Sequence, residues 1–330
     1  MREAGAVTLA QGAGAAAGHS DTVAILMGLH DGAAHLREQL DSLLAQSHPH
    51  WQLIVSDDRS RDDGPAMVRR FAAERPDRAV RLIDGPARGF AQNFLHLILA
   101  TGPQTRLVAL CDQDDVWLPQ KLARAVAALG GLRGPALYCA RTMICAPDLT
   151  PIRPSPVWPR AFGFANALVQ NVAAGNTIVL NREALDLARR LAPAAAAAGI
   201  VAHDWWLYQI VSGAGGRVIR DDEPVLLYRQ HPANVMGRND TAGAAAARLG
   251  KIVSGEFADW IGRHVAALSA GRDGLSPENA ARLASFAAAR AARGPAAVPR
   301  RIAQMRRAGI YRQTATGQAG LWLAALFGRL

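Results

Sequence analysis

Residues 107–121 constrain the fold of this chain more than any other segment. The apolar run Leu107–Cys111 is continuous and bounded by polar residues, which is typical of a buried strand. It leads directly into Asp112, Asp114 and Asp115, and a helical pattern follows. The sequence therefore predicts several carboxylates at the carboxyl end of a strand, which is where α/β sheets bind their ligands.

Two interpretations of this acidic cluster remain open from the spacing alone. Carboxylates packed this closely repel one another unless a cation or water separates them. A divalent ion such as Mg²⁺ or Mn²⁺ prefers oxygen ligands, would relieve that repulsion, and is normally shared with substrate phosphates. The alternative is a solvated acidic turn at the start of a helix, where Asp is common.

The alternation of strand and helix extends over the first 130 residues. Apolar runs alternate with segments of helical periodicity, at 23–29, 33–46, 51–56, 64–74, 80–83 and 90–100. This order predicts an α/β fold with a Rossmann-like, mostly parallel sheet flanked by helices. His30 and Asp31 follow the first apolar run and Asp57 and Asp58 the second, so polar side chains recur at one edge of the predicted sheet.

Composition and missing motifs exclude several classes of protein. The formal charge of +10 and the sequence pI near 10.6 favour anionic partners such as nucleotide phosphates or acidic lipid. No zinc-finger, homeodomain-like or RNP pattern supports nucleic-acid binding. The first predicted strand is not followed by Gly-x-Gly-x-x-Gly, and no Walker motif occurs. The sequence therefore does not favour a dinucleotide-binding oxidoreductase or a P-loop NTPase. The three cysteines lack C-x-x-C spacing, which favours reduced thiols in a cytosolic protein.

Four separated pieces of the chain, within about 22–237, match one family in order. These pieces are Ser-Asp-Asp-x-Ser at 56–60, Cys-Asp-Gln-Asp-Asp-Val-Trp-Leu-Pro-x-Lys at 111–121, His-Asp-Trp-Trp at 203–206 and Leu-Tyr-Arg-Gln-His-x-x-Asn at 227–234. Together they resemble family 2 glycosyltransferases, and within these the bacterial rhamnosyltransferase-like branch. The chain departs from the family pattern at Arg59, where Gly is usual, and at His30 and Asp31, where Tyr-Asn is usual.

The resemblance implies a GT-A fold, a nucleotide-sugar donor, Mn²⁺ or Mg²⁺, and transfer with inversion. By position, Asp57 resembles the acid that accepts from the pyrimidine N3–H, and Asp112 resembles the acid on the ribose side. Asp114 resembles the metal ligand of the DxD motif, and His231 a second contact to the metal. Asp204 resembles the general base.

The remaining candidates flank these positions. His30, Asp58 and Gln113 complete the predicted donor-binding set. Trp205, Trp206 and Asn176 are assigned to the acceptor side. An indole face suits a sugar ring, and we expect one of the two tryptophans to face the acceptor and the other to lie inside. Each candidate also has a structural alternative: a helix cap for Asp57 or Asp204, a structural histidine for His231, and core packing for the two tryptophans.

The chemistry of inverting transfer independently requires these residue types. A carboxylate must lie within hydrogen-bond reach of the acceptor hydroxyl, on the face opposite the leaving group. Positive charge on the departing diphosphate is supplied by a metal ion acting as a Lewis acid. A second carboxylate acting as leaving-group acid is therefore unnecessary, which distinguishes this site from a glycosidase pair.

The sequence predicts three segments and a bacterial cell-surface role. Residues 1–20 form a disordered Ala/Gly-rich lead, 21–236 a catalytic domain with a donor half (21–130) and an acceptor half (131–236), and 237–330 a helical C-terminal extension. The segment 321–327, with arginines upstream, fits either an interfacial helix or a helix packed on the domain or on a partner subunit. No apolar run reaches the ~18 residues of a membrane span. We expect a cytoplasmic protein at the inner face of the plasma membrane.

The predicted reaction moves a sugar, L-rhamnose from dTDP-L-rhamnose, onto a cell-surface polysaccharide or a lipid-linked glycan. One alternative is the same fold with a UDP-hexose or UDP-N-acetylhexosamine donor. The alternative from another class is a non-catalytic protein that binds nucleotide-sugars or polysaccharide. The sequence leaves the acceptor and the linkage open.

Overall fold

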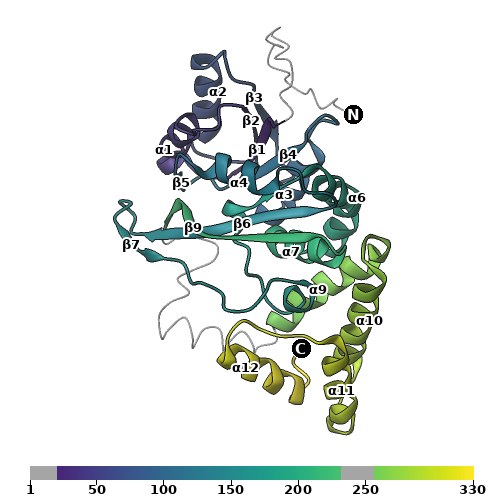
Figure 1. The fold of residues 1–330 in the computed structure, drawn as a ribbon. Helices are drawn as coiled ribbons and strands as arrows, with labels where there is room; N and C mark the ends of the chain where they lie inside the picture. The colour runs from purple at the N-terminus through teal and green to yellow at the C-terminus, as the bar shows by residue number, and fades with distance from the viewer. Residues whose placement is uncertain (1–20, 232–255) are drawn as a thin grey trace.

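A mixed sheet of nine strands organises the computed structural model, which describes residues 21–231 and 256–330 (Figure 1). The predicted disordered lead at 1–20 and the predicted boundary at 236–237 lie outside the described residues. The strands are β1 (Val23–Leu29), β2 (Trp51–Asp57), β3 (Val80–Asp84), β4 (Leu107–Cys111), β5 (Val116–Trp117), β6 (Ala136–Cys145), β7 (Pro151–Pro154), β8 (Val179–Leu180) and β9 (Arg217–Arg229).

Helices cover both faces of this sheet. In the first 231 residues they are α1 (Ala33–Leu44), α2 (Gly64–Glu74), α3 (Phe90–Leu99), α4 (Lys121–Leu129), α5 (Phe164–Ala167), the 3₁₀ turn η1 (Gly175–Thr177), α6 (Arg182–Ala198) and α7 (His203–Gly213). After residue 255 they are α9 (Glu256–Ala270), η2 (Arg272–Gly274), α10 (Pro277–Ala291), η3 (Pro295–Ala297), α11 (Val298–Ala308) and α12 (Ala315–Leu326).

The sheet has a parallel half and a mixed half. Its order is β3-β2-β1-β4-β8-β6-β9-β5, with β7 paired to β6. The first four strands are parallel, β8 is antiparallel to both of its neighbours, and β6 and β9 run parallel to each other. The predicted α/β fold with a mostly parallel, Rossmann-like sheet is therefore confirmed.

The central strand β1 shows how the sequence fixes this arrangement. Its side chains alternate between the two faces, and both faces are covered, so nearly the whole strand is apolar. Ala24 and Leu26 belong to the core cluster that contains α3, α6 and α7. Ile25 and Met27 belong to the opposite cluster, which contains α1, α2 and α4.

The helices after residue 255 share the first of these clusters. Ile261, Phe286 and Met305 from α9, α10 and α11 lie in the same buried set as α6 and α7. Arg301 of α11 is buried and donates from Nη1 to the carbonyl of Ala325 at 2.6 Å, which ties α11 to the end of α12. The predicted C-terminal extension is helical in its described part and packs continuously against the sheet-bearing region.

Candidate functional site

The loops after β1, β2 and β4 meet at one edge of the sheet, because their strands are parallel and in register. Gln113 joins two of these loops: His30 donates its backbone N–H to Gln113 Oε1 at 2.7 Å, and Gln113 Nε2 donates to the His30 carbonyl at 2.9 Å. His30 Nδ1 also lies 3.0 Å from the carbonyl oxygen of Asp58. The predicted donor residues His30 and Gln113 therefore form a connected frame at this edge.

Asp57 and Asp58 behave differently although they are adjacent. Asp57, at the end of β2, accepts from the Ser60 N–H at 3.0 Å and remains partly exposed. Asp58 is buried, and its two oxygens accept from the backbone N–H groups of Ala87 at 2.5 Å and Gly89 at 2.9 Å. The carboxylate of Asp58 therefore holds the loop before α3, and the structure does not support its predicted direct contact with the donor.

Asp114 and His231 meet, although 117 residues separate them in the sequence. The distance from His231 Nε2 to Asp114 Oδ2 is 2.8 Å, and both side chains are partly exposed. Arg229, near the end of β9, donates from Nε to the Asp114 carbonyl at 3.1 Å and so holds the two segments together. The end of β9 thus reaches the acidic loop after β4.

This pair fits two neighbouring ligands of one divalent ion. In an octahedral shell with bonds of about 2.1 Å, adjacent ligand atoms lie about 3 Å apart. Imidazole nitrogen and carboxylate oxygen are both ligands that Mn²⁺ accepts. Within residues 21–231 and 256–330, no cluster of three or more His, Cys, Asp or Glu side chains is arranged to hold a metal. Substrate phosphates and water would supply further ligands.

Asp112 and Asp204 line one cavity of about 360 Å³. Burial, together with the negative charges of Asp114 and Asp204, raises the pKa of Asp112 to about 7. Both side chains line this cavity. Asp112 directly follows β4, and Asp204 lies in the first turn of α7. Two distant segments therefore contribute acids to the same cavity.

Asp204 occupies the first turn of α7. Its Oδ1 accepts from the Trp205 N–H at 2.7 Å and its Oδ2 from Asn171 Nδ2 at 2.9 Å. Burial raises the pKa of Asp204, which makes it a stronger base than an exposed Asp. Gly175 packs closely against it, since a Cβ at position 175 would lie 3.2 Å from the Asp204 Cβ. Asn171 and Gly175 thus fix the position of the carboxylate.

Asn176 links this side of the cavity to the acidic loop. It is buried and lines the cavity, and its Nδ2 donates to Asp115 Oδ2 at 2.6 Å. Its carbonyl accepts from Lys121 Nζ at 2.5 Å. Its side-chain Oδ1 is buried and has no hydrogen-bond partner among the described residues. Asn176 therefore lies in the lining of the cavity with one unsatisfied acceptor atom, and its contact with the acceptor stays a prediction.

The sequence interpretation missed the structural importance of Lys121 and Asn171. Lys121 is fully buried, its Nζ lies 3.1 Å from the centre of the Trp117 ring, and burial lowers its pKa to about 7. One signal was available, because the chain contains only two lysines and this one ends the quoted motif. Asn171 lies in a loop without a motif, and only the fold brings it to Asp204.

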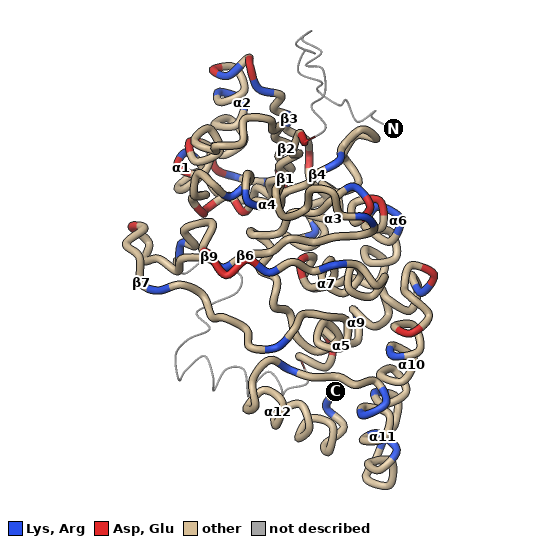
Figure 2. The backbone as a smooth tube through the Cα atoms, in the orientation of Figure 1, with Lys and Arg blue, Asp and Glu red and all other residues tan. Residues whose placement is uncertain are grey.

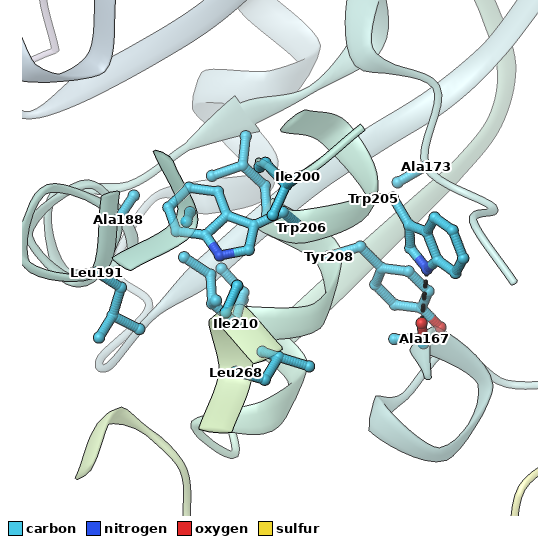
Figure 3. Packing of buried hydrophobic residues seen from close by; sticks show 14 of the residues in the cluster. Ala167, Ala173, Ala188, Leu191, Ile200, Trp205, Trp206, Tyr208, Ile210 and Leu268 are labelled. Carbon is cyan, nitrogen blue, oxygen red and sulfur yellow. Dashed lines mark hydrogen bonds between the residues drawn. The ribbon is translucent and has the colours of Figure 1, made fainter. Parts of the chain in front are cut away.

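The two tryptophans that follow Asp204 lie in the hydrophobic core (Figure 3). Trp205 is 4% exposed and donates from Nε1 to the Ala167 carbonyl at 2.6 Å, and Trp206 is 1% exposed. Both follow Asp204 on a helix that is buried over most of its surface, so their side chains pack inward. The predicted acceptor role of Trp205 and Trp206 is therefore not supported, because neither ring offers a face to a ligand.

Comparisons with known proteins find relatives among glycosyltransferases. Residues 25–182 match the family model described as Glycosyl transferase family 2. The dTDP-rhamnosyl transferase RfbG of Shigella flexneri is 25% identical over 235 residues, covering 68% of this chain and 78% of that protein. The putative glycosyltransferase EpsE of Bacillus subtilis is 32% identical over 108 residues, covering 32% of this chain and 38% of that protein.

A solved structure shows the same fold. Residues 1–349 of TarS from S. aureus, crystallised in complex with UDP, superpose with a TM-score of 0.51 at 12% identity, covering 86% of this chain and 89% of that one. At this identity the likeness concerns the fold alone, which is GT-A.

Proposed function

Because this chain belongs to glycosyl transferase family 2, we propose that it moves a sugar from a nucleotide-sugar to a saccharide acceptor with inversion at the anomeric carbon. One observation carries the proposal: Asp112, at the donor edge of the sheet, and Asp204, at the start of α7, line the same cavity. A reaction between two substrates needs such a shared space, because holding both in one geometry removes much of the barrier.

In this mechanism Asp204 is the general base. It accepts the proton of the acceptor hydroxyl as that oxygen attacks the anomeric carbon from the face opposite the diphosphate. Its raised pKa suits this role, and the amide of Asn171 orients the carboxylate. Asp57 and Asp112 bind the base and ribose of the donor, and the frame of His30 and Gln113 shapes that edge.

Asp114 and His231 would hold Mn²⁺ or Mg²⁺ together with the donor phosphates. The bound ion supplies Lewis-acid stabilisation of the departing diphosphate. The two residues are already placed at a spacing that suits adjacent ligands, with Arg229 fixing the backbone of Asp114. We expect a chelator such as EDTA to abolish transfer and added Mn²⁺ or Mg²⁺ to restore it.

We assign dTDP-L-rhamnose as the donor, on the likeness to a dTDP-rhamnosyl transferase and on the branch that the motifs resemble. The identity of 25% leaves a UDP-hexose or UDP-N-acetylhexosamine as the competing donor. A panel of nucleotide-sugars separates the two, with donor binding read from the melting temperature and transfer or hydrolysis read from release of the nucleoside diphosphate. Turnover with UDP-sugars alone would reject the rhamnose assignment. Binding without any turnover would favour the non-catalytic alternative.

We further propose that the acceptor is a lipid-linked saccharide and that the chain contacts the inner face of the plasma membrane through α11 and α12. Residues 279–330 contain nine arginines and no acidic residue, and Figure 2 shows this basic end of the chain. Leu321 of α12 is buried, whereas Leu323, Leu326 and Phe327 are exposed, Phe327 by 78%. Exposed apolar side chains beside arginines suit an anionic lipid surface.

Flotation of the whole chain with vesicles tests the membrane contact. Vesicles with anionic lipid should carry the protein upward more than purely zwitterionic ones. Changing Leu323, Leu326 and Phe327 together to Ser should abolish this, whereas Leu99→Ser and Ile152→Ser, at exposed positions elsewhere, should not. No helix in the described parts of the chain is long and apolar enough to cross a membrane. Equal flotation of the triple variant would refute the contact.

A further inference from the structure

One end of the cavity is basic. Beyond Asp112 and Asp204 its lining includes three arginines and one acid, namely Arg141 of β6, Arg153 of β7, and Arg220 and Asp222 of β9. It includes neither Asp114 nor His231, and no residue of β1 or β2. This part of the cavity is therefore separate from the edge where the donor phosphates are expected.

Arg141 differs from the neighbouring Arg220. Arg220 pairs with the carboxylate of Asp222, with Nε 2.9 Å from Oδ1. Arg141 donates to two backbone carbonyls, from Nε to Ser155 at 2.7 Å and from Nη1 to Asp222 at 3.3 Å. Among the described residues, no carboxylate forms an ion pair with Arg141. The two carbonyls therefore hold the guanidinium of Arg141 in place at the cavity lining, and no carboxylate in the described parts of the chain neutralises its positive charge.

The backbone around Arg141 is irregular. In the pairing of β6 with β9, the register shifts between Ala140 and Arg141 and again between Arg141 and Met143. Such bulges commonly lie beside active sites, where they redirect a side chain. The irregular pairing of β6 with β9 thus occurs at Arg141, the residue of β6 that adds a positive charge to the cavity lining.

The same cavity contains an unsatisfied buried acceptor. Asn176 is only 3% exposed, and its Oδ1 has no partner among the described residues, although buried polar atoms are nearly always hydrogen-bonded. A hydroxyl-rich ligand would satisfy this atom. The acceptor atom of Asn176 and the guanidinium of Arg141 together suit a ligand that carries both hydroxyl groups and negative charge.

We propose that Arg141 binds an anionic group on the acceptor, a phosphate or a carboxylate attached to the accepting sugar. The inference rests on the proposed function and specifies its acceptor. A guanidinium forms two parallel hydrogen bonds with either oxyanion. The donor diphosphate is a less suitable ligand for Arg141. Its charge is expected to be neutralised by a metal ion at the acids of the donor edge, whereas an anionic group on the acceptor would be neutralised by Arg141 itself.

The test is an NMR titration of the full chain, saturated with diamagnetic Mg²⁺ and the nucleoside diphosphate that it binds best, so that the donor site is filled. The probes are D-glucose 1-phosphate, D-glucuronate and neutral D-glucose. At least one of the two anions should bind tenfold or more tightly than glucose. Arg141→Gln should remove this advantage, while Arg217→Gln, at an exposed position of β9 outside the cavity, should keep it. The preferred anion shows whether the acceptor carries phosphate or an acidic sugar.

Arg141→Lys provides a second variant, in case Gln at this position lowers the melting temperature. Lys keeps the charge without the planar fork, and anion binding should fall between wild type and Arg141→Gln. The proposal is overturned if Arg141→Gln binds the anion as tightly as wild type, or if neither anion binds wild type more tightly than glucose. Failure of the nucleoside diphosphate to bind in the first step would instead refute the proposed function.

Discussion

The donor edge and the acceptor side of the cavity are built in different ways. At the donor edge, consecutive strand–helix units bring His30, Asp58 and Gln113 into hydrogen bonds that are complete within the protein. On the acceptor side, Asn176 and His203 carry buried polar atoms without partners among the described residues. Asp115 Oδ1, in the loop after β4, is likewise buried without a partner among the described residues. The contrast is therefore between the frame of His30, Asp58 and Gln113, whose hydrogen bonds are made within the protein, and the cavity-lining Asn176, which keeps an unsatisfied acceptor atom.

The largest effect that separates the two sides should come from Asp204→Asn. General-base catalysis contributes about 10²–10⁴-fold, so transfer should fall by about that factor. Affinity for the nucleoside diphosphate should not change, since the donor edge is untouched. Initial rates and calorimetric binding measure the two quantities. As a matched variant, Asp57→Asn should weaken nucleotide binding instead. Undiminished transfer by Asp204→Asn would remove the base assignment but leave the enzyme class.

Asp58→Ala should disturb the donor edge through stability. The carboxylate accepts from the N–H groups of Ala87 and Gly89, and hydrogen bonds to a charged group each contribute about 1.5–3 kcal/mol. The free energy of unfolding should therefore fall by about 3 kcal/mol in chemical denaturation. Asp63→Ala, at an exposed position before α2, is the control and should change it little. If the Asp58→Ala protein is as stable as wild type but no longer binds nucleotide, Asp58 contacts the donor directly, and its role in holding the loop is wrong.

The buried His264 should make the free energy of unfolding sensitive to acid. It is buried on α9, and its Nδ1 lies 2.8 Å from Oε1 of Gln209 on α7. Burial lowers the pKa of His264 to about 3 from an ordinary value near 6.5. Between these values the unfolded chain binds a proton that the folded chain does not, so stability falls as pH falls. At pH 5 this amounts to about 2 kcal/mol relative to pH 7.

Denaturation of His264→Asn at pH 7 and pH 5 measures this contribution. The variant should lose less stability than wild type between the two pH values. His203, whose pKa is also lowered to about 3 by burial, leaves part of the pH dependence in place. His96→Asn, at a partly exposed position on α3, should keep the full wild-type dependence. Identical pH dependence in wild type and His264→Asn would contradict the assignment.

The smallest predicted effect concerns Asn171. The amide donates to the ionised carboxylate of Asp204, which lowers its pKa against the effect of burial. Asn171→Ala should therefore raise the pKa of the base and move the acidic limb of kcat/KM to higher pH. The rate loss should reach about tenfold on that limb and shrink at high pH. A uniform loss at all pH values would show that Asn171 acts only on position.

The contrast between the two sides also explains what the sequence could predict. The strands β1, β2 and β4 are apolar runs that end in polar side chains, so the parallel half and its edge followed from periodicity and motif. The contacts of β6 and β9 depend on pairing between distant segments, and the bulge at Arg141 has no local signal. The helix α6 continues through Pro193 to Ala198, although proline disfavours a helix interior, because the inner face of α6 is buried.

Individual side chains divide in the same way. Asp114 and His231 were matched by motif, and the fold places them 2.8 Å apart. A motif gives the order of residues but not the direction of each side chain, which explains why both tryptophans lie inside although one was expected to face the acceptor. Asp58 illustrates the same limit, since adjacent acids at a strand end point to different partners.

Donor and acceptor residues should act on one sugar diphosphate where the donor edge meets the cavity at Asp112. A crystal structure with Mn²⁺ and dTDP, or UDP if that is the nucleotide bound, tests it most directly. We predict an anomalous manganese peak in contact with Asp114 and His231, the nucleotide base beside Asp57, and the diphosphate pointing toward the cavity that Asp112 and Asp204 line. Nucleotide bound away from Asp57 and Asp112, or manganese in contact with neither Asp114 nor His231, would contradict it.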